Sequence, residues 1–209
     1  SKGNPIETLL PMSGQYKAMI WDTVSDRKLA EASCRLADFG YSGFEASHQG
    51  SFGYNPAGVT NFPAFAGRNT FAFSSGSVTR TNFTAGKEYR LGFWSTTAPA
   101  CLIDGSPIIL VPGAIQGSWR YYEGVFVPAT TNAVLSITGA ANKYLDELRL
   151  YPTGAALQCW SHDPLFGVRA GSDLSGRMIY YEYDKLGRQT VVRDQEGNVL
   201  SKTEFHIGQ

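Results

Sequence analysis

The chain has 209 residues, and its 18 Lys and Arg residues balance 18 Asp and Glu residues. This charge excludes the basic field that a nucleic-acid backbone requires, and no apolar run approaches the roughly 18 residues of a membrane span. Charged residues make up only 17% of the chain, whereas it holds 23 glycines and 13% aromatic residues. Such a composition is typical of secreted β-proteins, and the length is enough to bury a full core.

Period-two alternation between turn signals runs through most of the chain, while helical periodicity is nearly absent. The alternation predicts strands over residues 16–22, 69–75, 89–95, 107–111, 119–128, 133–138 and 144–151. Short strands with glycine-rich connections predict a two-sheet β-sandwich. Residues 42–66 are rich in Gly, Ser and Phe without a clear period, and they predict a long ordered loop.

The C-terminal part of the chain repeats itself at a spacing of about 21 residues. The aligned pairs are Trp160 with Tyr181, Asp163 with Asp184, Asp173 with Asp194, and Gly176 with Gly197. In DKLGR and DQEGN, Gly187 and Gly197 stand where a tight hairpin turn needs a positive φ. These hairpins are too few to close a structure alone, so we expect a partner or the remainder of a longer polypeptide to complete them.

Two resemblances follow from these residues. The segment YYEYDKLGRQTVVRDQEGN resembles the YD repeat of RHS-type proteins, large bacterial surface and secreted proteins built from tandem β-hairpins, over about residues 157–209. The motifs YSGFEA, AGRNTFAF, GKEYRLGFW and YLDELRLYP are similar to the galactose-binding-like jelly rolls of carbohydrate-binding modules. Their pairing resembles RHS-like proteins of the Bacteroidetes type. It implies an all-β chain, with a leading hairpin segment over 1–38, a jelly-roll β-sandwich over 39–152 and YD-type hairpins over 153–209.

The jelly-roll resemblance implies a structural Ca²⁺ ion held by Glu45 of the GFE motif and Asp146 of the last strand. Loop carbonyls near GFE and in GRNTF would complete its shell, because Ca²⁺ takes about six to eight oxygens. Asp146 and Glu147 are neighbours on a predicted strand, so their side chains are expected on opposite faces and only Asp146 to join Glu45. The alternative is that Glu45 and Asp146 accept hydrogen bonds, or pair with Arg68 or Arg149.

Carbohydrate-binding modules of this type stack sugars on exposed aromatic side chains. The candidate ligand-binding residues are Tyr54, Trp94, Trp119 and Tyr122, with Phe62 and Tyr121 as further candidates. Trp94 and Trp119 fall inside predicted strands, so their alternative role is in the core. No cluster of aromatic and amide side chains stands out, and sugar binding therefore rests on analogy of fold.

Catalytic residues are not predicted. The chain has no GxSxG, HExxH or glycine-rich phosphate motif, and His48, His162 and His206 are scattered. Its three cysteines form no CxxC pair, which favours buried free thiols over one disulfide with a spare thiol.

We therefore expect a non-enzymatic structural or adhesive module of an exported or cell-surface RHS-like assembly, which acts through protein or glycan contacts. One alternative is a carbohydrate-binding module that captures glycans for an attached enzyme. Another is the delivery or shell part of a polymorphic toxin; the sequence stops at HIGQ directly after the repeats, which counts against this alternative unless the chain was truncated. The N-terminal SKGNPIETLL lacks the order of a signal peptide, so we expect the export address elsewhere or the chain to be a fragment.

Overall fold

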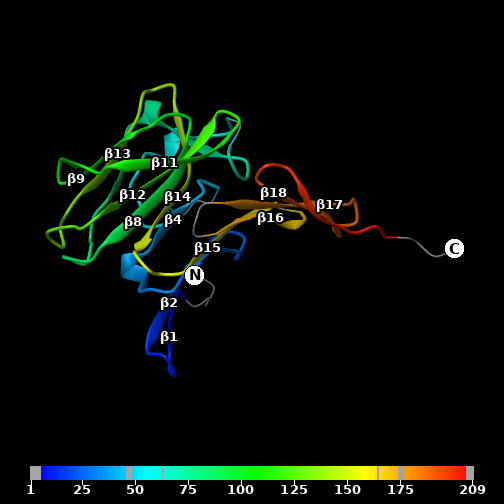
Figure 1. Ribbon diagram of the computed structural model, residues 1–209, viewed down its shortest axis with the longest axis horizontal. Coiled ribbons are helices and arrows are strands. Elements are labelled where there is room, and N and C mark those ends of the chain that lie inside the picture. Colours follow the sequence, from blue (N-terminus) through cyan, green and yellow to red (C-terminus); the bar gives the residue numbers. More distant parts are fainter. Residues whose placement is uncertain (1–5, 46–48, 63, 164, 174–176, 206–209) are drawn as a thin grey trace.

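The computed structural model describes residues 6–45, 49–62, 64–163, 165–173 and 177–205. In these residues the fold is all-β, as predicted, and the strands form three antiparallel sheets (Figure 1). Only short 3-10 helices interrupt them, at Leu36–Asp38, Pro56–Gly58 and Phe73–Ser75. Among the described residues, no helix is long and apolar enough to cross a membrane.

Two of the sheets pack face to face as a β-sandwich. In spatial order, the inner sheet holds β11 (Leu110–Gln116), β12 (Trp119–Phe126), β8 (Tyr89–Ser95), β14 (Tyr144–Pro152), β6 (Thr70–Ala72) and β5 (Val59–Thr60), and β4 (Gly40–Ser42) also pairs with β14. The outer sheet holds β10 (Ser106–Pro107), β9 (Ala100–Ile103), β13 (Leu135–Thr138) and β7 (Val78–Arg80). Alternate residues of facing strands, among them Phe93, Leu135 and Leu145, are fully buried between the sheets.

The third sheet, which we call the terminal sheet, is built from both ends of the chain. In spatial order it holds β1 (Glu7–Leu10), β2 (Gln15–Trp21), β3 (Lys28–Ala32), β15 (Leu157–Asp163), β16 (Gly167–Ser172), β17 (Met178–Tyr183), β18 (Gln189–Asp194) and β19 (Val199–Lys202). β3 precedes the sandwich in the chain and β15 follows it, and these two strands pair directly. The whole sandwich is therefore inserted between two neighbouring strands of the terminal sheet. At this junction Ser33 N donates to Ala156 O over 2.8 Å, and Ala156 N donates to Ser33 Oγ over 2.6 Å.

Small side chains let the terminal sheet lie close to the inner sheet of the sandwich. Ala18, Ala30 and Ala32 of β2 and β3 are buried against Phe39 and Tyr151. Farther along the terminal sheet, a second cluster covers the same outward face of the inner sheet. Its buried members are Phe65, Ala66, Trp94, Trp119, Tyr121, Ala170 and Met178. The inner sheet is therefore covered on both faces, which explains why β14 is buried along nearly its whole length.

Three predicted segments differ from the observed ones. The strand predicted over 69–75 ends at Ala72, because Phe73–Ser75 form a 3-10 helix. The predicted strand 107–111 is divided, because β10 ends at Pro107 in the outer sheet and β11 begins at Leu110 in the inner sheet. Between them, buried Ile108 donates its N–H to Cys101 O over 2.8 Å and turns the chain. The long region 42–66 is not one loop, since it contains a 3-10 turn and β5.

The turns of the C-terminal hairpins have the predicted backbone. Gly187 has φ +76° and Gly197 has φ +86°, the left-handed region that favours glycine. Asp184 Oδ1 accepts from Arg188 N over 3.0 Å, and Asp194 Oδ1 accepts from Asn198 N over 2.8 Å. Each aspartate therefore holds its own turn, which gives the repeated Asp-x-x-Gly pattern a local physical role.

A polar network fixes the chain where it enters the sandwich. Buried Asp38 accepts hydrogen bonds from Tyr89 Oη over 2.5 Å, Lys87 Nζ over 2.6 Å and Thr84 Oγ1 over 2.7 Å. Burial opposes ionisation of Asp38, but these hydrogen bonds outweigh it and lower its pKa. Nearby, Arg80 donates to Phe39 O over 2.8 Å. The first residues of the sandwich are thus tied to strands far along the chain.

Candidate functional site

A β-bulge in β14 decides where its acidic residues point. Asp146 pairs with Trp94 of β8 and Arg149 pairs with Gly92, so three steps along β14 match two steps along β8. The extra residue is accommodated at Glu147, whose φ is +51°.

The bulge places Asp146 and Glu147 on the same face. Leu145 and Leu148 on either side of them both lie in the sandwich core. The two carboxylates therefore turn away from that core, toward the terminal sheet, where both are buried. The expectation that Asp146 and Glu147 point to opposite faces is wrong, because strict alternation holds only for a regular strand.

Asp146 holds the backbone of the preceding loop. Its Oδ2 accepts from Phe65 N over 2.8 Å and from Ala66 N over 3.1 Å, and its Oδ1 accepts from Glu147 N over 2.7 Å. The side chain of Phe65 then stacks on Trp94, with ring centroids 3.8 Å apart. One buried carboxylate thus fixes both the loop and the ring that covers the inner sheet.

Glu45 holds the next residues of the same loop. Its Oε1 accepts from Arg68 N over 2.5 Å and from Asn69 N over 2.6 Å. Between these contacts and those of Asp146 lies Gly67, with φ +73°. A Cβ there would come within 2.4 Å of Glu45 Oε1, so only glycine fits. The structure therefore brings Glu45 and Asp146 onto one segment, 65–69, where both accept backbone N–H groups.

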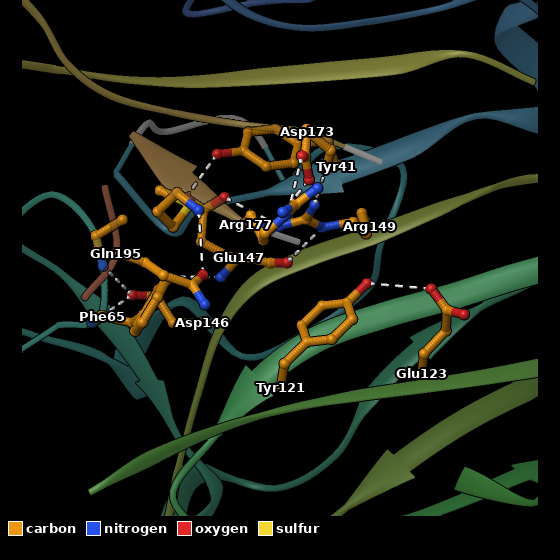
Figure 2. A network of polar contacts seen from close by, with 12 residues as sticks. Tyr41, Phe65, Tyr121, Glu123, Asp146, Glu147, Arg149, Asp173, Arg177 and Gln195 are labelled. Carbon is orange, nitrogen blue, oxygen red and sulfur yellow. Dashed lines mark hydrogen bonds and ion pairs between the residues drawn. The ribbon is translucent and has the colours of Figure 1, made fainter. Parts of the chain in front are cut away.

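Glu147 and Arg149 link the sandwich to the terminal sheet (Figure 2). Tyr41 Oη donates to Glu147 Oε1 over 2.9 Å, and Arg149 Nη2 lies 3.7 Å from Glu147 Oε2. Arg149 Nη1 donates to the backbone carbonyl of Asp173 over 3.0 Å. Its guanidinium also lies 5.6 Å from the ring centre of Tyr121. Sequence analysis named Glu147 only as the neighbour of Asp146, and it named Arg149 as a possible partner of Glu45 or Asp146, whereas the structure pairs Arg149 with Glu147.

Burial dominates the electrostatics of this cluster. It raises the pKa of Asp146 well above its usual range, and the charge of Glu147 raises it further. Burial also raises the pKa of Glu147, although Arg149 and the Tyr41 hydroxyl act in the opposite direction. Glu45 has a raised pKa for the same first reason. Arg149 opposes this rise at Glu147, and Arg68 and Arg169 oppose it at Glu45, but burial prevails at all three carboxylates, which therefore bind protons readily.

The donor atoms around Glu45 and Asp146 do not fit a calcium ion in this arrangement. Ca²⁺ needs about six to eight oxygens, whereas backbone N–H groups face these carboxylates. In the described part of the chain, no group of three His, Cys, Asp or Glu side chains is placed to hold a metal. The sequence left two roles open for Glu45 and Asp146, which were to bind Ca²⁺ or to accept hydrogen bonds. The resemblance to calcium-binding jelly rolls predicts the first role, and the observed geometry favours the second.

The aromatic residues proposed for sugar stacking lie against protein. Trp94 is 0% exposed, Trp119 6% and Tyr122 8%. Trp94 and Trp119 are covered from the terminal-sheet side, while Tyr122 belongs to the sandwich core. Tyr54 is half-buried and packs against that core, with its ring 5.2 Å from that of Phe44. These rings do not offer an open stacking platform, because their faces are occupied by neighbouring side chains.

An open cavity of about 540 Å³ lies instead on the inner sheet beside the linker to β15. Arg90 and Glu123 form an ion pair at its wall, and Tyr121 Oη lies 3.4 Å from Glu123 Oε2 (Figure 2). Gly92 makes room for Tyr121, since a Cβ there would meet its hydroxyl at 2.3 Å. Sequence analysis missed Arg90 and Glu123. The available signal was a glycine inside a strand, which marks close approach of another group.

Comparison with known proteins adds no family. No protein-family model matches the chain, and no curated protein matches it.

All three cysteines are free in the structure; Cys101 and Cys159 are buried and Cys34 is half-buried. His48 and His206 lie outside the described residues. Function therefore has to be argued from the geometry.

The buried carboxylates predict an unusual pH dependence. Their folded-state pKa values are raised, so their contribution to stability is complete below the unfolded value and is lost as pH rises through the folded one. Glu147→Gln keeps an acceptor for Tyr41 but removes one such group and lowers the pKa of Asp146. The free energy of unfolding should fall as pH rises from about 4 to about 7, and it should fall less in the variant than in the wild type. For each proton concerned, the difference is up to about 1.4 kcal/mol per pH unit.

Urea denaturation at several pH values measures this difference. Asp38→Asn is the control of opposite sign, because the pKa of Asp38 is lowered and its contribution disappears as pH falls. Parallel stability curves for the wild type and Glu147→Gln would contradict the assignment.

Calcium provides a second test at Glu45 and Asp146. Because N–H groups face their oxygens, we expect the melting temperature to be the same in EDTA and in CaCl₂. A bound ion would instead raise the melting temperature with the logarithm of calcium concentration, and Glu45→Gln would abolish that rise. MgCl₂ serves as the control for ionic strength. A calcium-specific rise in the wild type alone would overturn the hydrogen-bonded interpretation.

Proposed function

We propose that the chain is a non-enzymatic structural or adhesive module of an exported or cell-surface RHS-like assembly. The observation that carries this proposal is the pair of open edges of the terminal sheet. In the described part of the chain, β1 and β19 each pair on one side only, and every residue of both strands is exposed. Such edges accept further strands, from a protein partner or from the remainder of a longer chain.

The sandwich edges differ in a way that supports the proposal. β11 carries Pro112 beside a register shift, while β10 ends in Pro107. Proline and bulges blunt an edge against strand addition. β1 pairs with β2 in unbroken register and contains no proline, and β19 also contains no proline, although its register against β18 shifts at Leu200. Both strands expose apolar side chains such as Leu9, at 50%, and Leu200, at 58%.

The open face of the terminal sheet also suits a partner. A groove of about 490 Å³ runs over β15 to β19, and its apolar lining includes Trp160, Ile179, Tyr181 and Leu200. The opposite face is packed on the sandwich only as far as β17, so β18 is mostly half-buried and β19 is exposed along its whole length. The sandwich therefore acts as the rigid body, and the hairpins present a sheet to be extended.

A hairpin peptide tests this function. A synthetic peptide of residues 178–205 carries β17 to β19 and offers strands of the matching type. We expect it to bind the monomeric chain and to slow amide exchange at the β1 or β19 edge by about tenfold or more, as measured by NMR. A scrambled peptide is the control. Failure of the hairpin peptide to bind, with edge amides still exchanging freely, would contradict the proposed function.

Carbohydrate binding is the second candidate, and the cavity at Arg90 and Glu123 favours it. A charged pair beside the rings of Tyr121 and Tyr151 offers hydrogen-bonding groups for hydroxyls in an apolar setting. This places the candidate glycan site away from Tyr54, whose ring packs against Phe44.

A glycan array tests the second candidate. We expect binding to one sugar class, and a loss of about tenfold or more in Glu123→Gln, because a hydrogen bond to a charged group is removed. Lys185→Ala, at an exposed hairpin turn, is the control and should bind like the wild type. An array without binding, or equal binding by both variants, would count against this cavity.

A further inference from the structure

We propose that two copies of this chain join head to tail, with β1 of one copy pairing antiparallel to β19 of the next. In the proposed register, Glu7 lies opposite Lys202 and Thr8 lies opposite Ser201. This inference rests on the proposed function, in which the terminal sheet accepts further strands, and it identifies the added strand as one from a second copy.

The backbone hydrogen-bonding phase of both edges permits this register. Met19 N donates to Ile6 O over 2.8 Å, so Ile6 faces β2 and the next residue, Glu7, directs its N–H and C=O to the free edge. Thr203 N donates to Thr190 O over 2.8 Å, so Lys202 is directed to the free edge in the same way. Glu7 and Lys202 can therefore exchange two backbone hydrogen bonds.

The side chains of Glu7 and Lys202 also emerge on the same face of the sheet. Glu7 is opposite Ala18, which packs toward the sandwich. Lys202 is opposite Val191, and Val191 is opposite Glu182, two residues along β17 from Tyr180. Tyr180 packs toward the sandwich as well, and directly opposed residues share a face.

The rest of the two strands is complementary in this register. The hydroxyl of Thr8 meets that of Ser201. Beyond Ser201 the register of β19 shifts by one residue at Leu200, so the strict pairing covers Glu7 and Thr8, and the apolar pair Leu9 and Leu10 comes alongside Val199 and Leu200 without a one-to-one register. These apolar side chains are 41% to 58% exposed within one copy. Pairing would therefore cover apolar surface while an ion pair sets the register.

Glu7 and Lys202 each make a polar contact within the single copy. Glu7 Oε2 accepts from Leu36 N over 2.6 Å, which holds the carboxylate at the edge. Lys202 Nζ lies 2.7 Å from Glu204 Oε1 in an exposed pair, and its ammonium has further donors to offer. The new contact adds to these.

Pairing like strands is less favourable. In an antiparallel β1–β1 pair with the correct phase, Glu7 faces either Leu9 or another Glu7. In a β19–β19 pair, Lys202 faces another Lys202, or its ladder runs into the register shift at Leu200. The complementarity is therefore heterologous, and it builds a head-to-tail row or ring in place of a two-fold dimer.

Edge-blocking variants test the polarity of this contact. Leu9 and Lys202 have N–H groups directed outward, so Leu9→Pro and Lys202→Pro each block one edge without removing a ladder hydrogen bond. Sedimentation from about 10 µM to 1 mM should show concentration-dependent association of the wild type, in keeping with a short edge contact. We expect each variant alone to be monomeric and their mixture to form a 1:1 complex. Unchanged melting temperatures confirm that both variants fold.

Charge variants test the register. We expect Lys202→Glu to weaken association about tenfold, and the double variant Glu7→Lys with Lys202→Glu to recover most of it. Association that survives both proline variants would overturn the inference in favour of another surface. A wild type that stays monomeric would also overturn it, whereas the proposed function would still stand if the hairpin peptide binds. If the chain is monomeric and the peptide does not bind either, both proposals fail.

Discussion

The pairing of β3 with β15 is the constraint on which the rest of the structure depends. It joins strands from opposite ends of the chain and holds the entry and exit of the sandwich side by side, at Ser33 and Ala156. Because both ends of the sandwich are tied to one sheet, its inner sheet is pressed against small side chains such as Ala30 and Ala32. The pairing also makes β1 and β19 the outer edges of a continuous sheet, where the proposed function resides.

The contact between sandwich and terminal sheet is unusually polar for a buried interface. Asp146, Glu147 and Arg149 all lie there with almost no exposure, since the bulge directs both carboxylates the same way. Their hydrogen bonds reach Tyr41, the 65–69 loop and the Asp173 carbonyl. Buried ionic groups of this kind contribute little net stability once desolvation is counted, but an unmatched partner is costly. We infer that they fix the relative position of sandwich and sheet, while apolar burial supplies most of the free energy.

The sandwich and the terminal sheet differ in how much of their apolar surface and strand edges is covered. The sandwich buries most of its aromatic residues and ends its sheets in short or proline-containing strands, and an open cavity lies beside Arg90 and Glu123. The terminal sheet leaves β1 and β19 exposed along their whole length, and β18 is mostly half-buried. A module that binds through strand addition and, secondarily, through a polar cavity accounts for both surfaces.

The sequence by itself determined the all-β class, the sandwich and the hairpin turns, because alternation and glycine at positive φ are local properties of residues such as Gly187 and Gly197. The resemblance to carbohydrate-binding jelly rolls implied a shared calcium site for Glu45 and Asp146, whereas in the structure both carboxylates accept backbone N–H groups of the 65–69 loop. Only the tertiary structure decided that the two chain ends share one sheet, since strand pairing over such a sequence distance leaves no local signal. The bulge at Glu147 and the burial of Trp94 and Trp119 were likewise decided there. Each depends on which surface packs against a strand, and a single strand's alternation does not contain that information.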